Sequence, residues 1–224
     1  MELVISENTV PYIAYFMGQQ VDSVATVTDS DATVSAYSSS LDYLNNNFDE
    51  AAFFSKGHMG MWPGPYPYYT HLALQDHWGD NVKDSENGDI YPYTSENFRF
   101  VFLWHCKTAE LYPSVPDEWG EKSLPYAFTH DNTMTEYHTD TGWIVFLGWI
   151  GASPNFWDYI PQQDPWYNYQ YCHWVYYFFE ALGSWTNVEG ALGYACGNIY
   201  NMDFTCTPLY YWLMAWGDID RGMA

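Results

Sequence analysis

Three short apolar runs constrain the fold of this chain more than any other feature of its sequence. They are AAFFS from Ala51, FRFVFLW from Phe98 and TGWIVFLGW from Thr141. Each run is bounded by polar residues or glycine, which is typical of strands that are buried in a parallel sheet. The runs therefore predict three neighbouring parallel strands of one central sheet.

Helical patterns separate and follow these runs. The segment TDSDATVSAYSSSLDYLNNN offers an N-cap at Asp29, Ser30 or Asp31, and then apolar residues at the spacings of an amphipathic helix (Val34, Tyr37, Leu41 and Leu44). YNYQYCHWVYYFFEAL predicts an aromatic helix over 167–182, and a second helix is expected from an Asn187 cap. Strands that alternate with helices predict an α/β fold with a mostly parallel central sheet flanked by helices, a three-layer sandwich.

The rest of the chain gives weaker patterns. PYIAYFMG and SVATVT, within residues 10–28, carry β-branched and aromatic residues, so short β segments are predicted there. Residues 61–97 are rich in Pro, Gly, Asn and Asp and predict turns and a hairpin with little helix. A long loop is expected over 112–140, and a last strand in YYWLMAWGD. No internal repeat or long linker divides the chain, so we expect one domain over 1–224.

The charge of the chain excludes several classes of partner. Its 28 acidic and six basic residues give a net charge of -22, which repels phosphate backbones and anionic lipid headgroups. We therefore expect no nucleic-acid partner, and no apolar segment is long enough to predict a membrane span. The N-terminal residues lack the basic start and long apolar centre of a secretion signal. The acidic, aromatic-rich composition nevertheless favours an extracellular or cell-surface location.

A histidine and a cysteine follow two of the apolar runs. Gly57 and His58 come after the first run, and Cys106 comes after the second. Neighbouring parallel strands would bring His58 and Cys106 to the same carboxyl edge of the sheet, where ligands bind in such folds. A cysteine there can act as a nucleophile if a nearby histidine handles the proton. His105 either tunes this thiol or points to the opposite face, and side-chain alternation along a strand favours the second.

The other cysteines give no further site. The four cysteines fit neither a dense disulfide framework nor a CxxC zinc spacing (Cys106, Cys172, Cys196 and Cys206). A disulfide between Cys196 and Cys206 and free thiols at both positions are equally compatible with the sequence.

The order of these features resembles a known family. An apolar strand that ends in Gly-His, and about fifty residues later an apolar strand that ends in a cysteine, resembles the caspase-like (clan CD) cysteine peptidases, which include caspases, legumains, clostripains and gingipains. The matching residues are Gly57, His58 and Gly60, and then Cys106, Thr108 and Ala109. GWIVFLGWIGASPNF, FFEALGSWTNVEGALGYA and WLMAWGDIDRGM are similar to the later strand, the helix pair and the closing strand of the gingipain group. The FLWHC and PYAFTH segments are also similar to archaeal sequences.

The resemblance implies a caspase-haemoglobinase-like fold and a cysteine-dependent endopeptidase that acts on peptide or protein substrates. Cys106 would be the nucleophile, and His58 the general acid that protonates the leaving amine. The oxyanion hole would be formed by the backbone N–H groups of Met59, Gly60 and Cys106. Residues at the end of the third run would line the substrate pocket (Trp149 and Ser153). Only about fifty residues precede His58, so the family's first strand is either missing or belongs to a longer chain.

Two features leave other functions open. Met59 stands between His58 and Gly60, where the family has His-Gly directly, and YPYY and DPWYNYQY suit an aromatic binding surface. The main alternative is a catalytically inactive caspase-like domain that serves as an extracellular or surface binding or assembly module. A carbohydrate-binding aromatic surface on an unrelated sheet is a third hypothesis.

The sequence predicts no metal site. His71 and His77 are six residues apart, which matches no common ligand spacing on a helix or strand. The acidic residues of KDSENGD miss the calcium-loop pattern (Asp84, Glu86 and Asp89). We expect no required cofactor, with calcium left open, and the sequence leaves the oligomeric state open as well.

Overall fold

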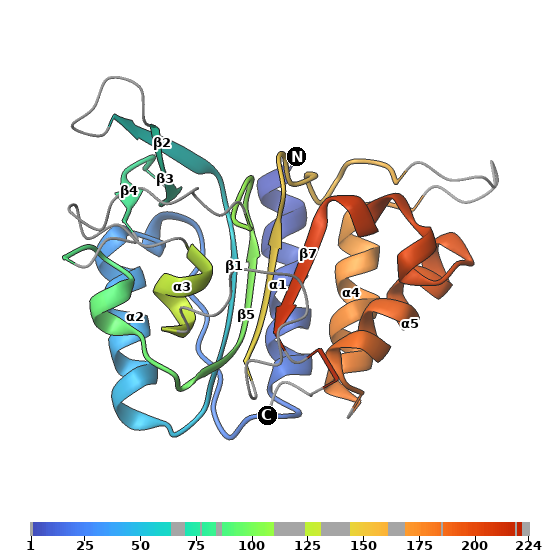
Figure 1. The fold of residues 1–224 in the computed structure, drawn as a ribbon, viewed down its shortest axis with the longest axis horizontal. Coiled ribbons are helices and arrows are strands. Elements are labelled where there is room, and N and C mark those ends of the chain that lie inside the picture. The colour runs from blue at the N-terminus through green and yellow to red at the C-terminus, as the bar shows by residue number, and fades with distance from the viewer. Residues whose placement is uncertain are drawn as a thin grey trace. The chain divides into compact units, whose positions relative to one another are not determined.

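The computed structural model describes the chain in nine segments: residues 2–63, 70–76, 78–83, 87–109, 124–130, 144–160, 169–184, 186–217 and 219–220 (Figure 1). The helices are α1 (Glu2–Met17), α2 (Val34–Asn47), α3 (Leu124–Thr129), α4 (Tyr171–Gly183) and α5 (Val188–Tyr200). The strands are β1 (Ala51–Lys56), β2 (Met59–Pro63), β3 (Thr70–Gln75), β4 (Asn81–Val82), β5 (Phe98–Trp104), β6 (Val145–Trp149) and β7 (Leu213–Gly217).

The chain divides into two compact units, which we describe separately. The sheet unit comprises Ser30–Ser153 and Trp212–Asp218. The helical unit comprises Met1–Asp29, Pro154–Tyr211 and Ile219–Ala224.

The sheet unit is built on a four-stranded sheet with the order β1-β5-β6-β7 (Figure 1). β1, β5 and β6 are parallel, and β7 is antiparallel to β6. Phe53 pairs with Val101, and Val101 pairs with Phe146, so the predicted neighbouring parallel strands are confirmed. The fold class is α/β with a mostly parallel central sheet, as the sequence predicted.

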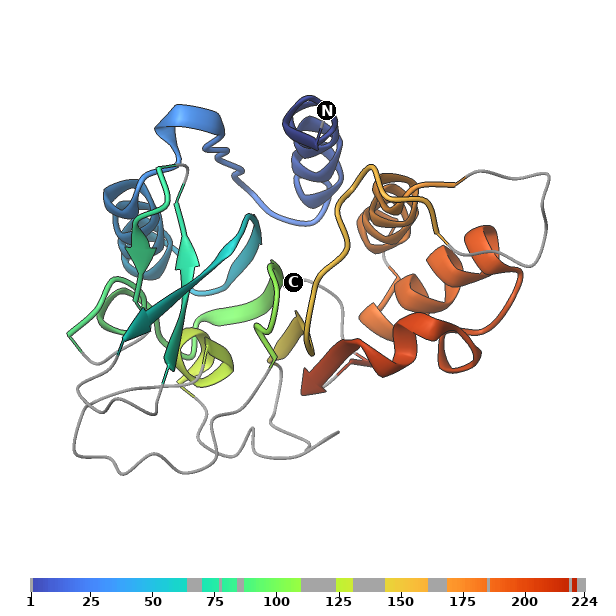
Figure 2. The same cartoon turned by 90° about the horizontal axis from the view of Figure 1, so that it is seen from above.

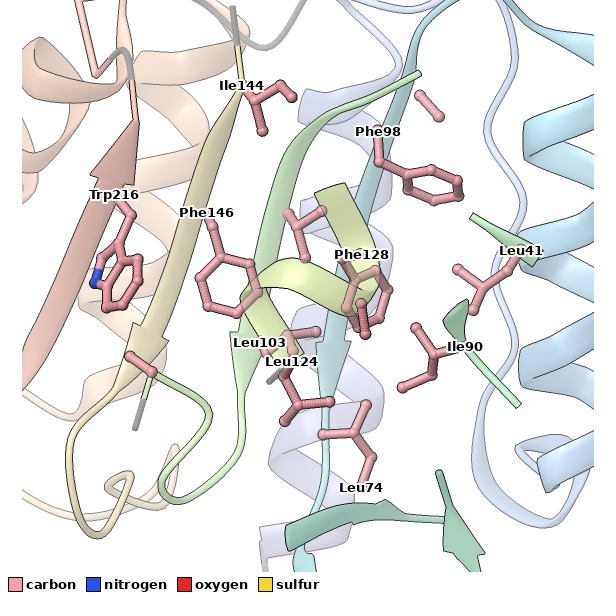
Figure 3. Packing of buried hydrophobic residues seen from close by; sticks show 14 of the residues in the cluster. Leu41, Leu74, Ile90, Phe98, Leu103, Leu124, Phe128, Ile144, Phe146 and Trp216 are labelled. Atoms are coloured by element: carbon pink, nitrogen blue, oxygen red, sulfur yellow. The ribbon is translucent and has the colours of Figure 1, made fainter. Parts of the chain in front are cut away.

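Helices α2 and α3 pack on one face of this sheet. Figure 3 shows Leu41 of α2 and Phe128 of α3 in one buried cluster with side chains from β5, β6 and β7 (Leu103, Phe146 and Trp216). Fully burying a Phe or Leu side chain stabilises the fold by roughly 1.5–3 kcal/mol, so this cluster is a main source of stability. The strand residues whose side chains point to the opposite face of the sheet are buried too (Phe100, Phe102, Trp104, Leu147 and Trp149). Burial of both faces is consistent with the predicted three-layer sandwich.

A second, antiparallel sheet with the order β2-β3-β4 follows β1 directly (Figure 2). Its β2–β3 pair lies in the Pro- and Gly-rich region where the sequence predicts a hairpin, and this prediction is confirmed. Helix α3 corrects the long loop predicted over 112–140, because Leu124 to Thr129 are helical and mostly buried. The start of α2 is corrected as well. Thr33 is its N-cap, and Asp29–Asp31 form a 3-10 turn before it.

The helical unit contains α1, α4 and α5, and α4 and α5 lie side by side (Figures 1 and 2). The two later helices were predicted, and Asn187 caps α5 by accepting a hydrogen bond from Gly190 N at 2.8 Å. Gly183 allows close packing of α4 on α1, because a Cβ there would lie 2.8 Å from the Phe16 carbonyl oxygen.

The predicted β segments in residues 10–28 are wrong. Residues 10–17 belong to α1, where Tyr12 and Phe16, four positions apart, both make edge-to-face contacts with Tyr176. This helical packing outweighs β propensity, whose whole scale spans only about 1 kcal/mol. Residues 23–28 form no strand, and Val24 is 40% exposed.

No helix in the described segments is long and apolar enough to cross a membrane.

Candidate active site

The register of β1 and β5 places His58 and Cys106 at the same edge of the sheet. Lys56 and Trp104 are the last paired residues of the two strands, and His58 and Cys106 each lie two positions beyond. Gly57 N extends the pairing by donating to the Trp104 carbonyl oxygen at 3.4 Å. Adjacent strands are about 4.8 Å apart, so the two segments leave the sheet side by side.

Ser153 contacts the Cys106 thiol. Cys106 is half-buried, and its Sγ accepts a hydrogen bond from Ser153 N at 3.4 Å. The two side chains also meet, with Sγ and Oγ 3.6 Å apart. His58, by contrast, is exposed. The edge therefore combines a fixed, partly accessible sulfur with an imidazole that solvent or a substrate can reach.

The turn that carries Cys106 is fastened to the end of β6. Lys107 has a φ of 61°, a left-handed conformation that is uncommon for residues with a side chain, and its N–H donates to the Gly151 carbonyl oxygen at 2.6 Å. Thr108 is buried, and its Oγ1 accepts from Trp149 N at 3.1 Å. Gly148 leaves room for this contact, because a Cβ there would lie 2.8 Å from Thr108 Oγ1.

Trp149, the second predicted pocket residue, is not at an open surface. It is 1% exposed, and its ring makes an edge contact with Trp104 at a centroid distance of 4.7 Å. Trp149 Nε1 is buried and has no hydrogen-bond partner among the described residues. Trp149 thus packs in the sheet, and of the two predicted pocket residues only Ser153 touches the thiol.

His105 points to β1. Its Nε2 lies 2.9 Å from Ser55 Oγ, and its Nδ1 lies 3.0 Å from the His58 carbonyl oxygen. Burial lowers the pKa of His105 to about 4, an effect that the hydrogen bond to His58 opposes. The ring is therefore neutral near pH 7. The sequence had favoured a side chain directed away from the thiol, but it gave no sign of these two partners.

The predicted oxyanion donors lie at the start of β2. Met59 pairs with Leu74 and Gly60 with Ala73, and consecutive residues of an antiparallel strand face their partner strand alternately. Because β2 is at the edge of its described sheet, only one of these two N–H groups points away from β3. The Met59 side chain packs against the buried cluster.

The other candidates form no site in the described part of the chain. Both Cys196 and Cys206 are free thiols, the first buried and the second exposed, so they form no disulfide. Cys172 is half-buried. The described residues contain no group of three or more side chains arranged to hold a metal ion. Several acidic and histidine positions considered for metals lie outside the described residues (His77, Asp84 and Glu86), and nothing is described of the His71 side chain.

Comparison of the chain with protein-family models, curated proteins and solved structures gave no significant match. A functional assignment therefore depends on the geometry of the site.

Proposed function

We propose that this chain is a cysteine-dependent endopeptidase of the caspase and gingipain type, with Cys106 as nucleophile and His58 as general acid. One observation carries the proposal. A half-buried thiol held by Ser153 and an exposed histidine follow neighbouring parallel strands at equal offsets from the last paired residues. The order of the later elements also supports it, since a strand, a helix pair and a closing strand follow the cysteine as the resemblance implies.

The proposed reaction uses one thiolate and one imidazolium. The Cys106 thiolate attacks the scissile carbonyl carbon and forms a C–S bond, which moves an electron pair onto the carbonyl oxygen. When that pair returns, the C–N bond breaks and the amine leaves with the proton of His58. Water then attacks the thioester, gives a proton to His58, and displaces the thiolate as the carboxylic acid leaves. Both groups thereby return to their starting states.

The N–H of Met59 or Gly60 that points away from β3 is one proposed oxyanion donor, and the N–H of Cys106 is a second. A single well-placed donor of this kind is worth about 2.7–4 kcal/mol of barrier. We propose that no metal ion takes part in these steps, and assays with and without added calcium test that point.

Cleavage of a mixed peptide library under reducing conditions tests the proposal. Cys106→Ala should abolish cleavage while changing the free energy of unfolding by no more than about 1–2 kcal/mol. His58→Ala should lower kcat by about 10²–10⁴-fold, as expected for loss of a general acid. Cys206→Ala is the matched control, because it removes an exposed thiol outside the site and should leave kcat unchanged. Cleavage that survives Cys106→Ala would reject the mechanism.

A second proposed function is a catalytically inactive binding or assembly module of the same fold. Exposed aromatic side chains favour it, for example Tyr211 at 73% and Trp212 at 53% exposure. This function predicts no cleavage by the wild-type chain in any of the assays above. The net charge of -22 supports an extracellular or cell-surface location for either function, which fractionation of native cells can test.

A further inference from the structure

A chain of hydrogen bonds runs from helix α2 to the backbone of His58. Tyr37 Oη lies 2.5 Å from Ser55 Oγ, and Ser55 Oγ lies 2.9 Å from His105 Nε2. His105 Nδ1 then lies 3.0 Å from the His58 carbonyl oxygen. Ser55 is 7% exposed and His105 is fully buried, so water does not compete for these groups as it does at a surface.

The chemistry of these groups determines which atom donates and which accepts in each of the three hydrogen bonds. A carbonyl oxygen only accepts, so His105 Nδ1 carries the proton and donates it to the hydrogen bond with His58. Burial keeps the ring neutral near pH 7 by lowering its pKa, so Nε2 accepts from the Ser55 hydroxyl. Ser55 accepts in turn from Tyr37, whose pKa burial raises above its ordinary value. Ser55 and His105 thus each both donate and accept, and Tyr37 begins the series as a donor.

The last bond of the chain ties His58 to the turn of the thiol. The loop between β1 and β2 has two contacts of this kind, Gly57 N to the Trp104 carbonyl oxygen at 3.4 Å and His105 Nδ1 to His58 at 3.0 Å. Both partners come from the two residues that directly precede Cys106. The shorter contact, from His105, therefore fixes the spacing between the His58 backbone and the Cys106 turn.

We propose that His105 is a positioning residue for His58, held in its orientation by a relay from Tyr37 through Ser55. The relay places the backbone of the general acid beside the nucleophile without touching the substrate. The catalytic consequence rests on the proposed peptidase function, whereas the ordering of the His58 segment does not depend on it.

Two uncharged substitutions of His105 test its two ring hydrogen bonds one at a time. His105→Asn places an amide N–H near the position of Nδ1 and keeps the bond to His58, while His105→Gln reaches the Nε2 position and keeps the bond to Ser55. Hydrogen–deuterium exchange of the peptide that contains His58 is measured in both variants. We expect His105→Gln to exchange about tenfold faster than wild type, and His105→Asn, which loses the bond to Ser55 but keeps the bond to His58, to exchange only a few fold faster. Exchange in α5 is the internal control, and it should not change.

Tyr37→Phe covers the case in which a substitution at His105 prevents folding. It keeps the ring and removes only the hydroxyl at the far end of the relay, so the same His58 peptide should exchange faster by a few fold. Equal exchange in His105→Asn and His105→Gln, or no change in Tyr37→Phe, would overturn the relay.

Peptide cleavage supplies the second readout. In His105→Gln, kcat should fall by about 10–100-fold with KM nearly unchanged, since a displacement of about 1 Å can cost 10²-fold. His105→Asn should recover most of this loss, and iodoacetamide should alkylate Cys106 at the wild-type rate in both. A wild-type chain that cleaves nothing would reject the proposed function, and the exchange measurements would then decide on the relay alone. Equal kcat in both variants would overturn the positioning role.

Discussion

Replacing Thr108 by valine tests whether one hydroxyl holds the turn that carries Cys106. Thr108 Oγ1 lies 3.2 Å from the carbonyl oxygens of Leu103 and His105 and accepts from the N–H of Trp149 at 3.1 Å. Valine keeps the shape of threonine but leaves this buried N–H without its acceptor. An unsatisfied buried donor costs about 1–3 kcal/mol, and the lost donated bond costs about 1 kcal/mol more. We therefore expect the free energy of unfolding to fall by about 2–4 kcal/mol.

The assay is urea unfolding followed by tryptophan fluorescence, with Thr108→Ser as the matched control. Serine keeps the hydroxyl and loses one methyl group, which costs about 1 kcal/mol. The valine variant should therefore unfold at a lower urea midpoint than the serine variant, with the same slope. Iodoacetamide should also alkylate Cys106 faster in the valine variant, because its turn is less firmly held. Equal midpoints for the two variants would refute the argument.

Four further predictions concern packing, pH dependence and thiol exposure. Gly148→Ala should lower the free energy of unfolding by about 1–3 kcal/mol, because the added Cβ would lie 2.8 Å from Thr108 Oγ1. A Cβ at Gly197 would have no atom within 4 Å, so Gly197→Ala should raise the free energy of unfolding by about 0.5–1 kcal/mol. A lower free energy of unfolding in Gly197→Ala would contradict this argument. Between pH 6.5 and about 4 the unfolded chain binds a proton at His105 before the folded chain does, so stability on the order of 3 kcal/mol should be lost as the pH falls. Urea titrations should show that the free energy of unfolding depends less on pH in His105→Asn than in the wild type. The same pH dependence in both proteins would contradict the role given to His105. Mass spectrometry after brief alkylation should find Cys206 labelled and Cys196 protected, and equal labelling would contradict their burial.

The central strands were predictable because of where they lie. Strands that are buried on both faces carry apolar residues at nearly every position, so β5 and β6 appear in the sequence as nearly continuous apolar runs, in which the half-buried Arg99 of β5 is the charged exception. The first helix was not predictable in this way. Its aromatic residues satisfy β propensity and a helical face equally well, and only contact with α4 decides between the two. Helix α3 was missed because six residues are too few to give a clear helical period.

In the site, the contacts that depend on the exact pairing of β1 with β5 could not be predicted from the sequence. We could predict that His58 and Cys106 lie at one edge of the sheet because each follows the end of a parallel strand. This prediction does not depend on which residues of the two strands pair. The link between Ser55 and His105 does depend on this pairing, because Ser55 pairs with Leu103 only in the observed register. A shift of one residue would turn the His105 side chain to the other face and break the relay. The one available signal was a serine inside the apolar run AAFFS, a polar group that must find a partner once the strand is buried. A buried polar residue in a predicted strand thus indicates a cross-strand contact, and the residue next to a candidate nucleophile is a suitable place to look for it.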